Sequence, residues 1–199
     1  MKPISILWLL FLCCIFNTPN FLLAQDTSRF TRMQKLGDIL LKTDQVIVLG
    51  KADSACIDAL SRSYCLIKFA PLIGFADYSA RVDSLKPRSP IDYSSNQTAR
   101  RYRKVLKQTY KSEGINFAGH YCLAYWGCGS PCQECAIIDT RTGKVYDGPS
   151  AGNGYGYHKD SRMLIVNPPD SNGWYLNVPY AIPGVYIWND TNKKFEQKN

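Results

Sequence analysis

The segment of residues 116–135 constrains the fold of this chain more than any other stretch. These twenty residues contain four of the eight cysteines, one of the two histidines and one of the four tryptophans in the sequence. Cysteines at this density either cross-link a small structure or serve a redox or metal site. The segment therefore predicts either a disulfide-stapled structural element or a functional site.

Residues 1–24 have the pattern of a secretory signal. Lys2 gives a basic start, residues 4–16 are apolar, and Ala24 is a small residue at which cleavage before Gln25 is expected. The alternative is a membrane anchor, but a span needs about 20 apolar residues and this run is shorter. We therefore predict export to the periplasm or the exterior, with no transmembrane span left after cleavage.

Cleavage would remove two cysteines and leave six, an even number in an oxidising compartment, which favours disulfides. The remaining length is sufficient for a hydrophobic core that does not depend on these bridges. We expect an N-terminal helical and extended region with a linker over residues 25–90. The main domain is expected over residues 91–199.

The strongest helical pattern covers residues 95–112. Its apolar positions, including Val105 and Leu106, recur with helical spacing. Ser94 or Ser95 can cap the start, and Gly114 suits a left-handed stop. The opposite stripe is cationic and consists of Arg100, Lys104, Lys107 and Lys111.

Much of the formal net charge of +8 lies on this helix, which also carries Arg101 and Arg103 and has no acidic residue. The charge pattern favours a helix that packs its apolar face on the core and leaves its basic face in solvent. The alternative is a dock for an acidic surface, such as phospholipid headgroups or an anionic envelope polymer. Nucleic acid is not expected as a partner, because the chain has no motif that reads it.

The N-terminal region gives weaker signals. Residues 45–49 form a short β-like run that ends at Gly50, and residues 86–90 contain two prolines that favour an extended linker. Another apolar set keeps helical spacing and predicts an N-terminal helix: Phe30, Met33, Leu36, Ile39 and Leu40.

The pattern changes to strands after Gly114. From residue 115 to residue 126 the side chains alternate, with Tyr121 and Leu123 on one face and His120, Cys122 and Trp126 on the other. Further strands are expected over residues 134–140, 144–146, 162–166 and 184–188, with a return through residues 194–195. Short connections imply antiparallel pairing. The predicted fold is α+β, with N-terminal helices and one basic amphipathic helix packed on an antiparallel β meander.

Several short motifs resemble an uncharacterised family of small exported bacterial proteins. The most specific is Asn-Phe-Ala-Gly-His-Tyr at residues 116–121, followed by Trp-Gly-Cys-Gly-x-x-Cys at residues 126–132. The resemblance runs from about Phe75 to the C-terminus and includes residues 75–78, 91–94, 99–103, 138–139, 142–145 and 160–162. It implies a bacterial envelope protein and carries no established reaction.

The resemblance also bears on the disulfides. Cys128 and Cys132 lie inside the family pattern, which implies that they form a bridge. The other four cysteines lie outside it, and their connectivity stays open. Cys56 and Cys65 enclose a polar segment that a local bridge could close, and Cys122–Cys135 is the pair that then remains.

Two other chemistries use the same cysteines. Cys132 and Cys135 form a C-x-x-C that could be redox-active, but a redox pair is expected at a helix N-terminus and this one lies in a hairpin. His120 and the cysteines are enough candidate ligands for zinc, yet their spacing does not form the two close ligand pairs that are typical of structural zinc sites. We therefore expect no metal and no cofactor.

His120 is the main catalytic candidate. As a general base it would need an orienting carboxylate, and Asp139 on the neighbouring strand is the nearest candidate, with His158 as a further member. A buried histidine bonded to backbone is the alternative. The sequence has no nucleophile elbow and no convincing pair of carboxylates.

Aromatic residues supply a candidate binding surface. Tyr155 and Tyr157 lie in a glycine-rich loop, and Trp174 and Tyr175 lie in a second one. Such rings beside asparagine suit a sugar or peptide ligand. The alternative is an ordinary loop whose tyrosines shield a sheet face.

These observations together favour a non-catalytic binding or structural module over an enzyme. The main alternative is a hydrolase in which His120 is the general base. A cleft that joins His120, Asp139 and His158 would favour the enzyme, whereas an aromatic-rimmed groove would favour binding. The predicted partners are an envelope polymer, a peptide or a sugar.

Overall fold

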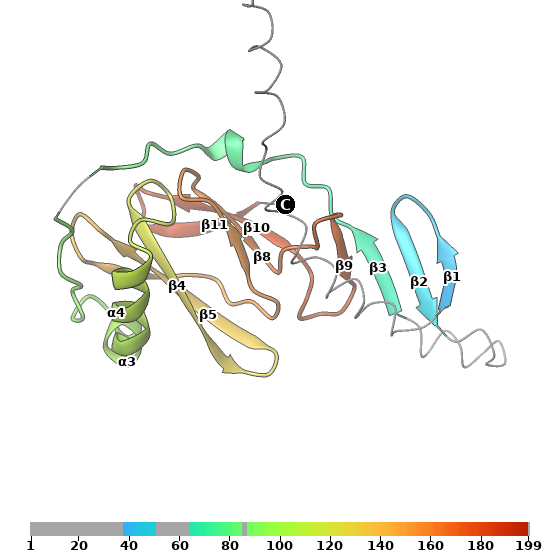
Figure 1. The fold of residues 1–199 in the computed structure, drawn as a ribbon, viewed down its shortest axis with the longest axis horizontal. Coiled ribbons are helices and arrows are strands. Elements are labelled where there is room, and N and C mark those ends of the chain that lie inside the picture. Colours follow the sequence, from blue (N-terminus) through green and yellow to red (C-terminus); the bar gives the residue numbers. More distant parts are fainter. Residues whose placement is uncertain (1–37, 51–63, 85–86, 199) are drawn as a thin grey trace, which may run out of the picture. The chain divides into compact units, whose positions relative to one another are not determined.

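The computed structural model describes residues 38–50, 64–84 and 87–198. Within these ranges the chain is mostly β, with eleven strands in three antiparallel sheets (Figure 1). The α-helices there are α3 (Gln97–Arg101) and α4 (Arg103–Ser112). The predicted α+β fold with N-terminal helices is therefore wrong. The predicted signal peptide at residues 1–24 lies outside the described residues.

The first sheet has the order β1-β2-β3-β9, formed by β1 (Asp38–Lys42), β2 (Val46–Gly50), β3 (Tyr64–Lys68) and β9 (Trp174–Leu176). Ile39 and Leu40, which were expected in a helix, lie in β1. The cause is a tight turn in which the Thr43 hydroxyl accepts a hydrogen bond from the Val46 amide at 2.9 Å and aligns the two strands. The β-like run at residues 45–49 is confirmed as β2. The rest of the expected helix lies outside the described residues.

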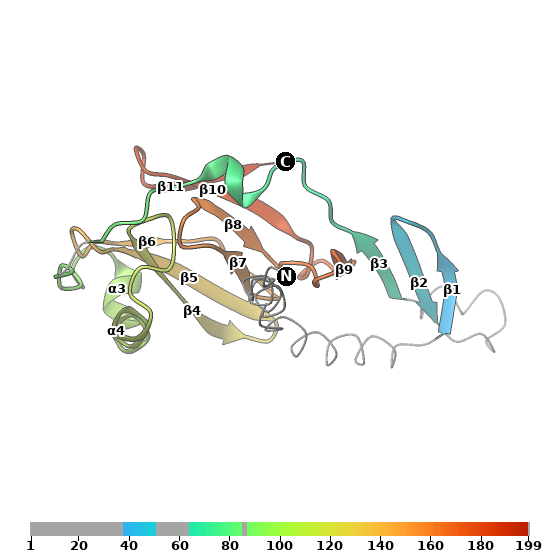
Figure 2. The ribbon, with the colours of Figure 1, turned by 45° about the horizontal axis from the view of Figure 1, so that its top comes forward.

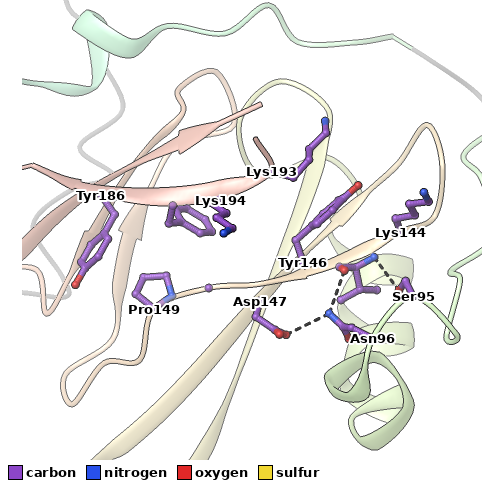
Figure 3. A pocket seen from close by; sticks show the side chains of 12 residues that line it. Ser95, Asn96, Lys144, Tyr146, Asp147, Pro149, Tyr186, Lys193 and Lys194 are labelled. Atoms are coloured by element: carbon purple, nitrogen blue, oxygen red, sulfur yellow. Dashed lines mark hydrogen bonds between the residues drawn. The ribbon is translucent and has the colours of Figure 1, made fainter. Parts of the chain in front are cut away.

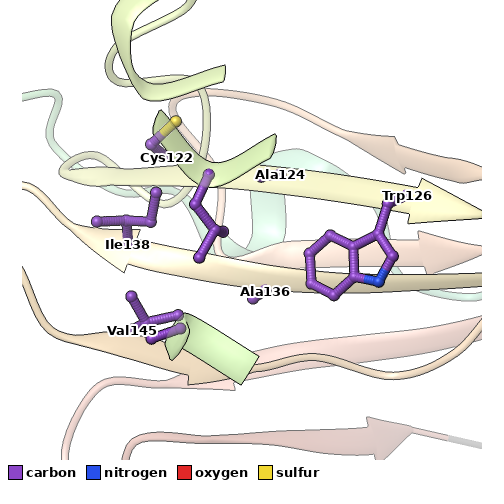
Figure 4. Packing of buried hydrophobic residues seen from close by; sticks show 8 residues of the cluster. Cys122, Ala124, Trp126, Ala136, Ile138 and Val145 are labelled. Carbon is purple, nitrogen blue, oxygen red and sulfur yellow. The ribbon is translucent and has the colours of Figure 1, made fainter. Parts of the chain in front are cut away.

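The second sheet consists of β4 (Tyr121–Gly129), β5 (Cys132–Asp139) and β6 (Val145–Asp147). Its two faces are both apolar, and the predicted alternation holds from Tyr121 onward. Cys122, Ala124 and Trp126 pack under the helices, as Figure 4 shows together with Ile138 and Val145. Tyr121 and Leu123 pack on the other side.

β4 begins six residues later than expected because the chain turns first. Ala118 and Gly119 have φ angles of 45° and 80°, which end any extended run before Tyr121. The Asn116 side chain then closes this turn against Leu123, accepting from its amide at 2.6 Å and donating to its carbonyl at 3.0 Å. The Asn-Phe-Ala-Gly-His-Tyr motif at residues 116–121 thus forms a tight turn that leads into β4.

The basic helix is present but divided. Asn96, rather than a serine, caps α3 by accepting a hydrogen bond from the Ala99 amide at 2.7 Å. Tyr102 separates α3 from α4, and Gly114 has the expected left-handed conformation just after the helix. Leu106 is fully buried, with Val105 and Tyr110 partly buried beside it, so the predicted apolar face is confirmed.

The third sheet has the order β11-β10-β8-β7, formed by β7 (Tyr155–Tyr157), β8 (Met163–Val166), β10 (Gly184–Asn189) and β11 (Lys194–Lys198). Leu164 and Trp188 from this sheet pack against Leu123 and Ile137 of the second sheet. The β4–β5 hairpin therefore lies between the helices and the third sheet (Figure 2).

A strap formed by residues 69–84 covers the other face of the third sheet. It contains the short 3-10 helix η2 (Phe75–Tyr78), and its apolar side chains pack on Met163 and Ile187. The Ser161 hydroxyl donates to the Phe75 carbonyl at 2.7 Å, and the Asp83 amide donates to the Gly119 carbonyl at 2.8 Å. The division of the chain near residue 90 stays a prediction, although this strap packs on the C-terminal part.

The predicted Cys128–Cys132 disulfide is confirmed at the tip of the β4–β5 hairpin. The predicted Cys122–Cys135 bridge is wrong, because the two side chains lie on opposite faces of the same sheet and are unpaired within the described residues. Cys56, the predicted partner of Cys65, lies outside the described residues. In the described part of the chain no helix is long and apolar enough to cross a membrane.

Candidate functional site

A polar network centred on the buried Tyr121 lies where β4 begins and the β10–β11 turn folds over it, and its charged members Asp190 and Lys193 are partly exposed. The Tyr121 hydroxyl donates a hydrogen bond to Asp190. Lys193 donates to Asp190 at 2.7 Å and to Tyr121 at 2.9 Å. Lys193 has a φ of 55°, a left-handed conformation that costs a non-glycine residue about 1 kcal/mol. The turn thus holds the lysine ammonium against the sheet.

The charges of this network reinforce one another. Burial opposes ionisation of Lys193, but its bonds to Asp190 and Tyr121 outweigh burial and raise the pKa of the ammonium. Burial and the bond to Asp190 raise the pKa of Tyr121. Tyr121 therefore stays neutral and Lys193 stays charged at physiological pH, so neither is a base.

An ion pair joins the strap to the second sheet beside this network. Arg141 binds both oxygens of Asp83, at 2.7 and 3.0 Å. The hydrogen bond from Arg141 lowers the pKa of the Asp83 carboxyl. This pair holds the strap near His120, whose imidazole adds to the lowering of the Asp83 pKa.

His120 is buried at the start of β4, with a relative exposure of 7%. Its backbone carbonyl accepts hydrogen bonds from the amide and the hydroxyl of Thr140, at 3.0 and 2.8 Å. Its ring lies 4.2 Å from the ring of Tyr121, measured between centroids. Burial and the positive charge of Arg141 lower the pKa of His120, partly offset by neighbouring carboxylates such as Asp139.

The lowered pKa of His120 predicts a pH dependence of stability. The unfolded chain, with a histidine pKa near 6.5, binds the proton more readily than the folded chain. The free energy of unfolding should therefore fall as the pH drops from 7 towards 5, which urea denaturation at both pH values can measure. His120→Gln should weaken this dependence. An equal dependence in the wild type and in this variant would contradict the assignment.

The three catalytic candidates have different surroundings. Asp139 lies near His120, but its carboxylate accepts a hydrogen bond from the Arg141 amide at 2.9 Å. Within the described residues no hydrogen bond joins it to the His120 ring. His158 is exposed and stacks on Phe75, with ring centroids 4.0 Å apart. His120 and Asp139 lie near each other, and the Gly119 amide donates to the Lys159 carbonyl at 2.7 Å, so the backbone next to His158 lies close to that of His120. A shared catalytic role of the three residues stays a prediction.

A groove of about 760 Å³ opens next to the polar network, between the β6 segment and the β10–β11 hairpin (Figure 3). Lys193 belongs to both features. Three aromatic rings and three lysines line the groove: Tyr146, Tyr186, Phe195, Lys144, Lys193 and Lys194.

The groove carries net positive charge. Lys144 and Lys194 are exposed, and neither forms an ion pair within the described ranges. Asp147 is the acidic lining residue, and its carboxylate accepts a hydrogen bond from Asn96 at 3.3 Å. Tyr146 is fixed by packing on Trp188, with ring centroids 5.5 Å apart. A preformed groove with rigid rings and unpaired ammonium groups can bind an anion attached to a ring.

The predicted aromatic binding residues lie elsewhere. Tyr155 and Tyr157 form β7, a strand rather than a loop, and both pack on the core between the second and third sheets. The Tyr155 hydroxyl donates to the carbonyls of Gln133 and Pro149, at 3.0 and 2.8 Å. Trp174 and Tyr175 lie in β9 of the first sheet. The expected glycine-rich loop around Tyr155 and Tyr157 is therefore wrong, and binding by the four rings stays a prediction.

The cysteine segment offers no redox pair. Cys132 is bridged to Cys128, and Cys135 is buried with its thiol donating to the Pro149 carbonyl at 3.4 Å. Burial raises the pKa of Cys135 to about 12, so its thiol is not a nucleophile at neutral pH. Among the described residues no group of three or more His, Cys, Asp or Glu side chains could hold a metal ion.

Most residues of the site carry no local signal in the sequence. The groove lysines, the network residue Asp190 and the ion pair of Asp83 with Arg141 come from segments far apart in the chain. One available signal was the turn at residues 189–194, where two lysines follow Asn-Asp-Thr-Asn.

No model of a known protein family matches the chain, and no curated protein or solved structure matches it. The resemblance of the motifs at residues 116–132 to a family of exported bacterial proteins stays a prediction.

Proposed function

We propose that the protein is an exported, non-catalytic binding module that takes an acidic sugar into the groove beside the polar network. The observation that carries the proposal is the groove itself, with unpaired lysines beside three aromatic rings. Aromatic faces pack on the apolar faces of sugar rings, and ammonium groups bind carboxylates or sulfates.

Two further observations support export and binding. The Cys128–Cys132 disulfide is typical of oxidising compartments, which agrees with the signal expected at residues 1–24. The alternative of a hydrolase has less support, because His158 stacks on Phe75 and the described residues give His120 no hydrogen-bonded base or nucleophile.

The proposal predicts that neutralising the groove weakens binding of an acidic sugar. Lys144→Gln/Lys194→Gln should lower the affinity for a short galacturonic acid oligomer roughly fivefold to tenfold, since each exposed charge contributes about 0.2–1 kcal/mol. Isothermal titration calorimetry at low salt measures the effect.

The matched control is Lys42→Gln/Lys159→Gln, which removes the same charge from exposed lysines outside the groove lining. This control should bind like the wild type, and a neutral dextran oligomer should bind all three proteins weakly. No binding of the acidic oligomer to the wild type, or equal loss in both variants, would contradict the proposal.

A further inference from the structure

We infer that the ligand is a linear acidic polysaccharide that leaves the groove and continues along the basic face of α3 and α4. This inference rests on the proposed function and names the polymer class and the second surface that it contacts. The inference gives a binding role to the six arginine and lysine side chains of α3 and α4, none of which lines the groove.

The basic face is exposed and unpaired. Its six cations all have exposed side chains, and none forms an ion pair within the described part of the chain. The helices contain no acidic residue, so no intrahelical partner is available. The stripe itself consists of Arg100, Lys104, Lys107 and Lys111. Arg101 and Arg103 flank it and lie over the rings of Tyr102 and Tyr93.

The face is continuous with the groove. Ser95 and Asn96 line the groove, and Asn96 is also the N-cap of α3. Arg100 reaches back from α3 and donates to the Ser94 carbonyl at 3.3 Å, which places its guanidinium beside the groove-lining Ser95. A polyanion bound at Lys144 therefore meets the first cation of the helix face directly outside the groove.

Two carboxylates border this path, and both are already bound by protein groups. Asp92 accepts from the Ser94 amide at 2.9 Å and from the Ser94 hydroxyl at 2.6 Å. Asp147 accepts from Asn96 at 3.3 Å. The lysines and arginines around these two carboxylates outnumber them, so the net charge along the path stays positive.

The shape and chemistry of the groove and of the basic face indicate which kind of polymer binds. A flat bilayer can touch an exposed helix but cannot enter a groove, whereas a flexible chain reaches both. The aromatic lining of the groove suits sugar rings. The Cys128–Cys132 disulfide suits an oxidising compartment, which is consistent with a polysaccharide of the cell envelope.

The test compares short and long polygalacturonate by isothermal titration calorimetry on the full chain. The helix variant Arg100→Gln/Lys104→Gln/Lys107→Gln should bind the long polymer roughly tenfold more weakly than the wild type, and the short oligomer within about twofold. The groove variant Lys144→Gln/Lys194→Gln should lose affinity for both. The charge-matched control Lys42→Gln/Lys159→Gln/Lys198→Gln should bind both like the wild type.

The failures of the two proposals are distinguishable. Unchanged binding of the long polymer by the helix variant would overturn this inference and leave the groove proposal standing. Equal loss in the charge-matched control would show a general charge effect and would also overturn it. Tighter binding of a single-stranded DNA of equal charge, or of phosphatidylglycerol vesicles through the helix face alone, would overturn the assignment to a polysaccharide.

Discussion

Gly119→Ala is expected to destabilise the protein by about 3 kcal/mol, from a left-handed backbone that disfavours alanine and a clash with neighbouring backbone. Gly119 has a φ of 80°, and a Cβ atom there would lie 2.3 Å from the Arg81 carbonyl oxygen. The strap is held at this point by the hydrogen bond from the Asp83 amide to Gly119, so it cannot move away cheaply. Urea denaturation followed by tryptophan fluorescence measures the loss.

The control for this prediction is Gly127→Ala. A Cβ atom at Gly127 would meet nothing within 4 Å, and its φ lies outside the left-handed range. This variant should change the free energy of unfolding by less than about 1 kcal/mol. A Gly119→Ala protein as stable as the Gly127→Ala protein would show that the strap does not pack on the turn as described.

Asp190→Ala is expected to cost about 2–3 kcal/mol, because an unpaired buried polar group costs about 1–3 kcal/mol and bonds to a charged group contribute about 1.5–3 kcal/mol. Asp190 accepts hydrogen bonds from Tyr121, from Trp188 at 3.3 Å and from Lys193. Tyr121 and Trp188 are fully buried and each loses its acceptor, whereas water can replace part of the network on the exposed side, because the Asp190 side chain is 44% exposed.

A double-mutant cycle tests whether the loss comes from the network. Tyr121→Phe removes the buried hydroxyl, so Asp190→Ala should cost less in that background than in the wild type. Additive losses would show that the two groups are not coupled and would contradict the network. Thermal or urea unfolding of the four proteins provides the cycle.

The same carboxylate predicts sensitivity to strong acid. Burial opposes ionisation of Asp190, but hydrogen bonds from Lys193 and Tyr121 outweigh it and lower its pKa to about 2. A carboxyl whose folded-state pKa lies below the ordinary value near 4 stabilises the fold above that value. This contribution should be lost as the pH falls from about 4 towards 2, and Asp190→Ala should lose that part of the acid dependence.

The parts of the fold that sequence analysis predicted correctly are those with local causes. The apolar face around Leu106 follows from helical spacing, and the alternation after Tyr121 follows from strand geometry. The helix predicted through Ile39 and Leu40 is wrong because pairing with β2 outweighs their helical spacing. Short strands such as β7 and β9 owe their pairing to distant partners, which no local pattern indicates.

The candidate site was predicted less well for the same reason. Strand pairing places Asp139 opposite Tyr121, so the proximity of His120 to Asp139 could be inferred from the order of the strands. The groove depends on how the β10–β11 turn meets the β6 segment, and no short-range pattern gives that geometry. Tyr155 and Tyr157 looked like loop residues because glycines surround them, yet β8 pairs with them as a strand.

The positions of Cys122 and Cys135 have a consequence for oxidative folding. The sheet separates the two thiols, the helices cover Cys122 and the third sheet covers Cys135. Burial raises the pKa of each thiol to about 12, so neither takes part in thiol exchange in the folded protein. Non-native disulfides of these cysteines must therefore form before the helices and the third sheet pack on the β4–β5 hairpin, and slow packing should lower the yield of correctly oxidised protein.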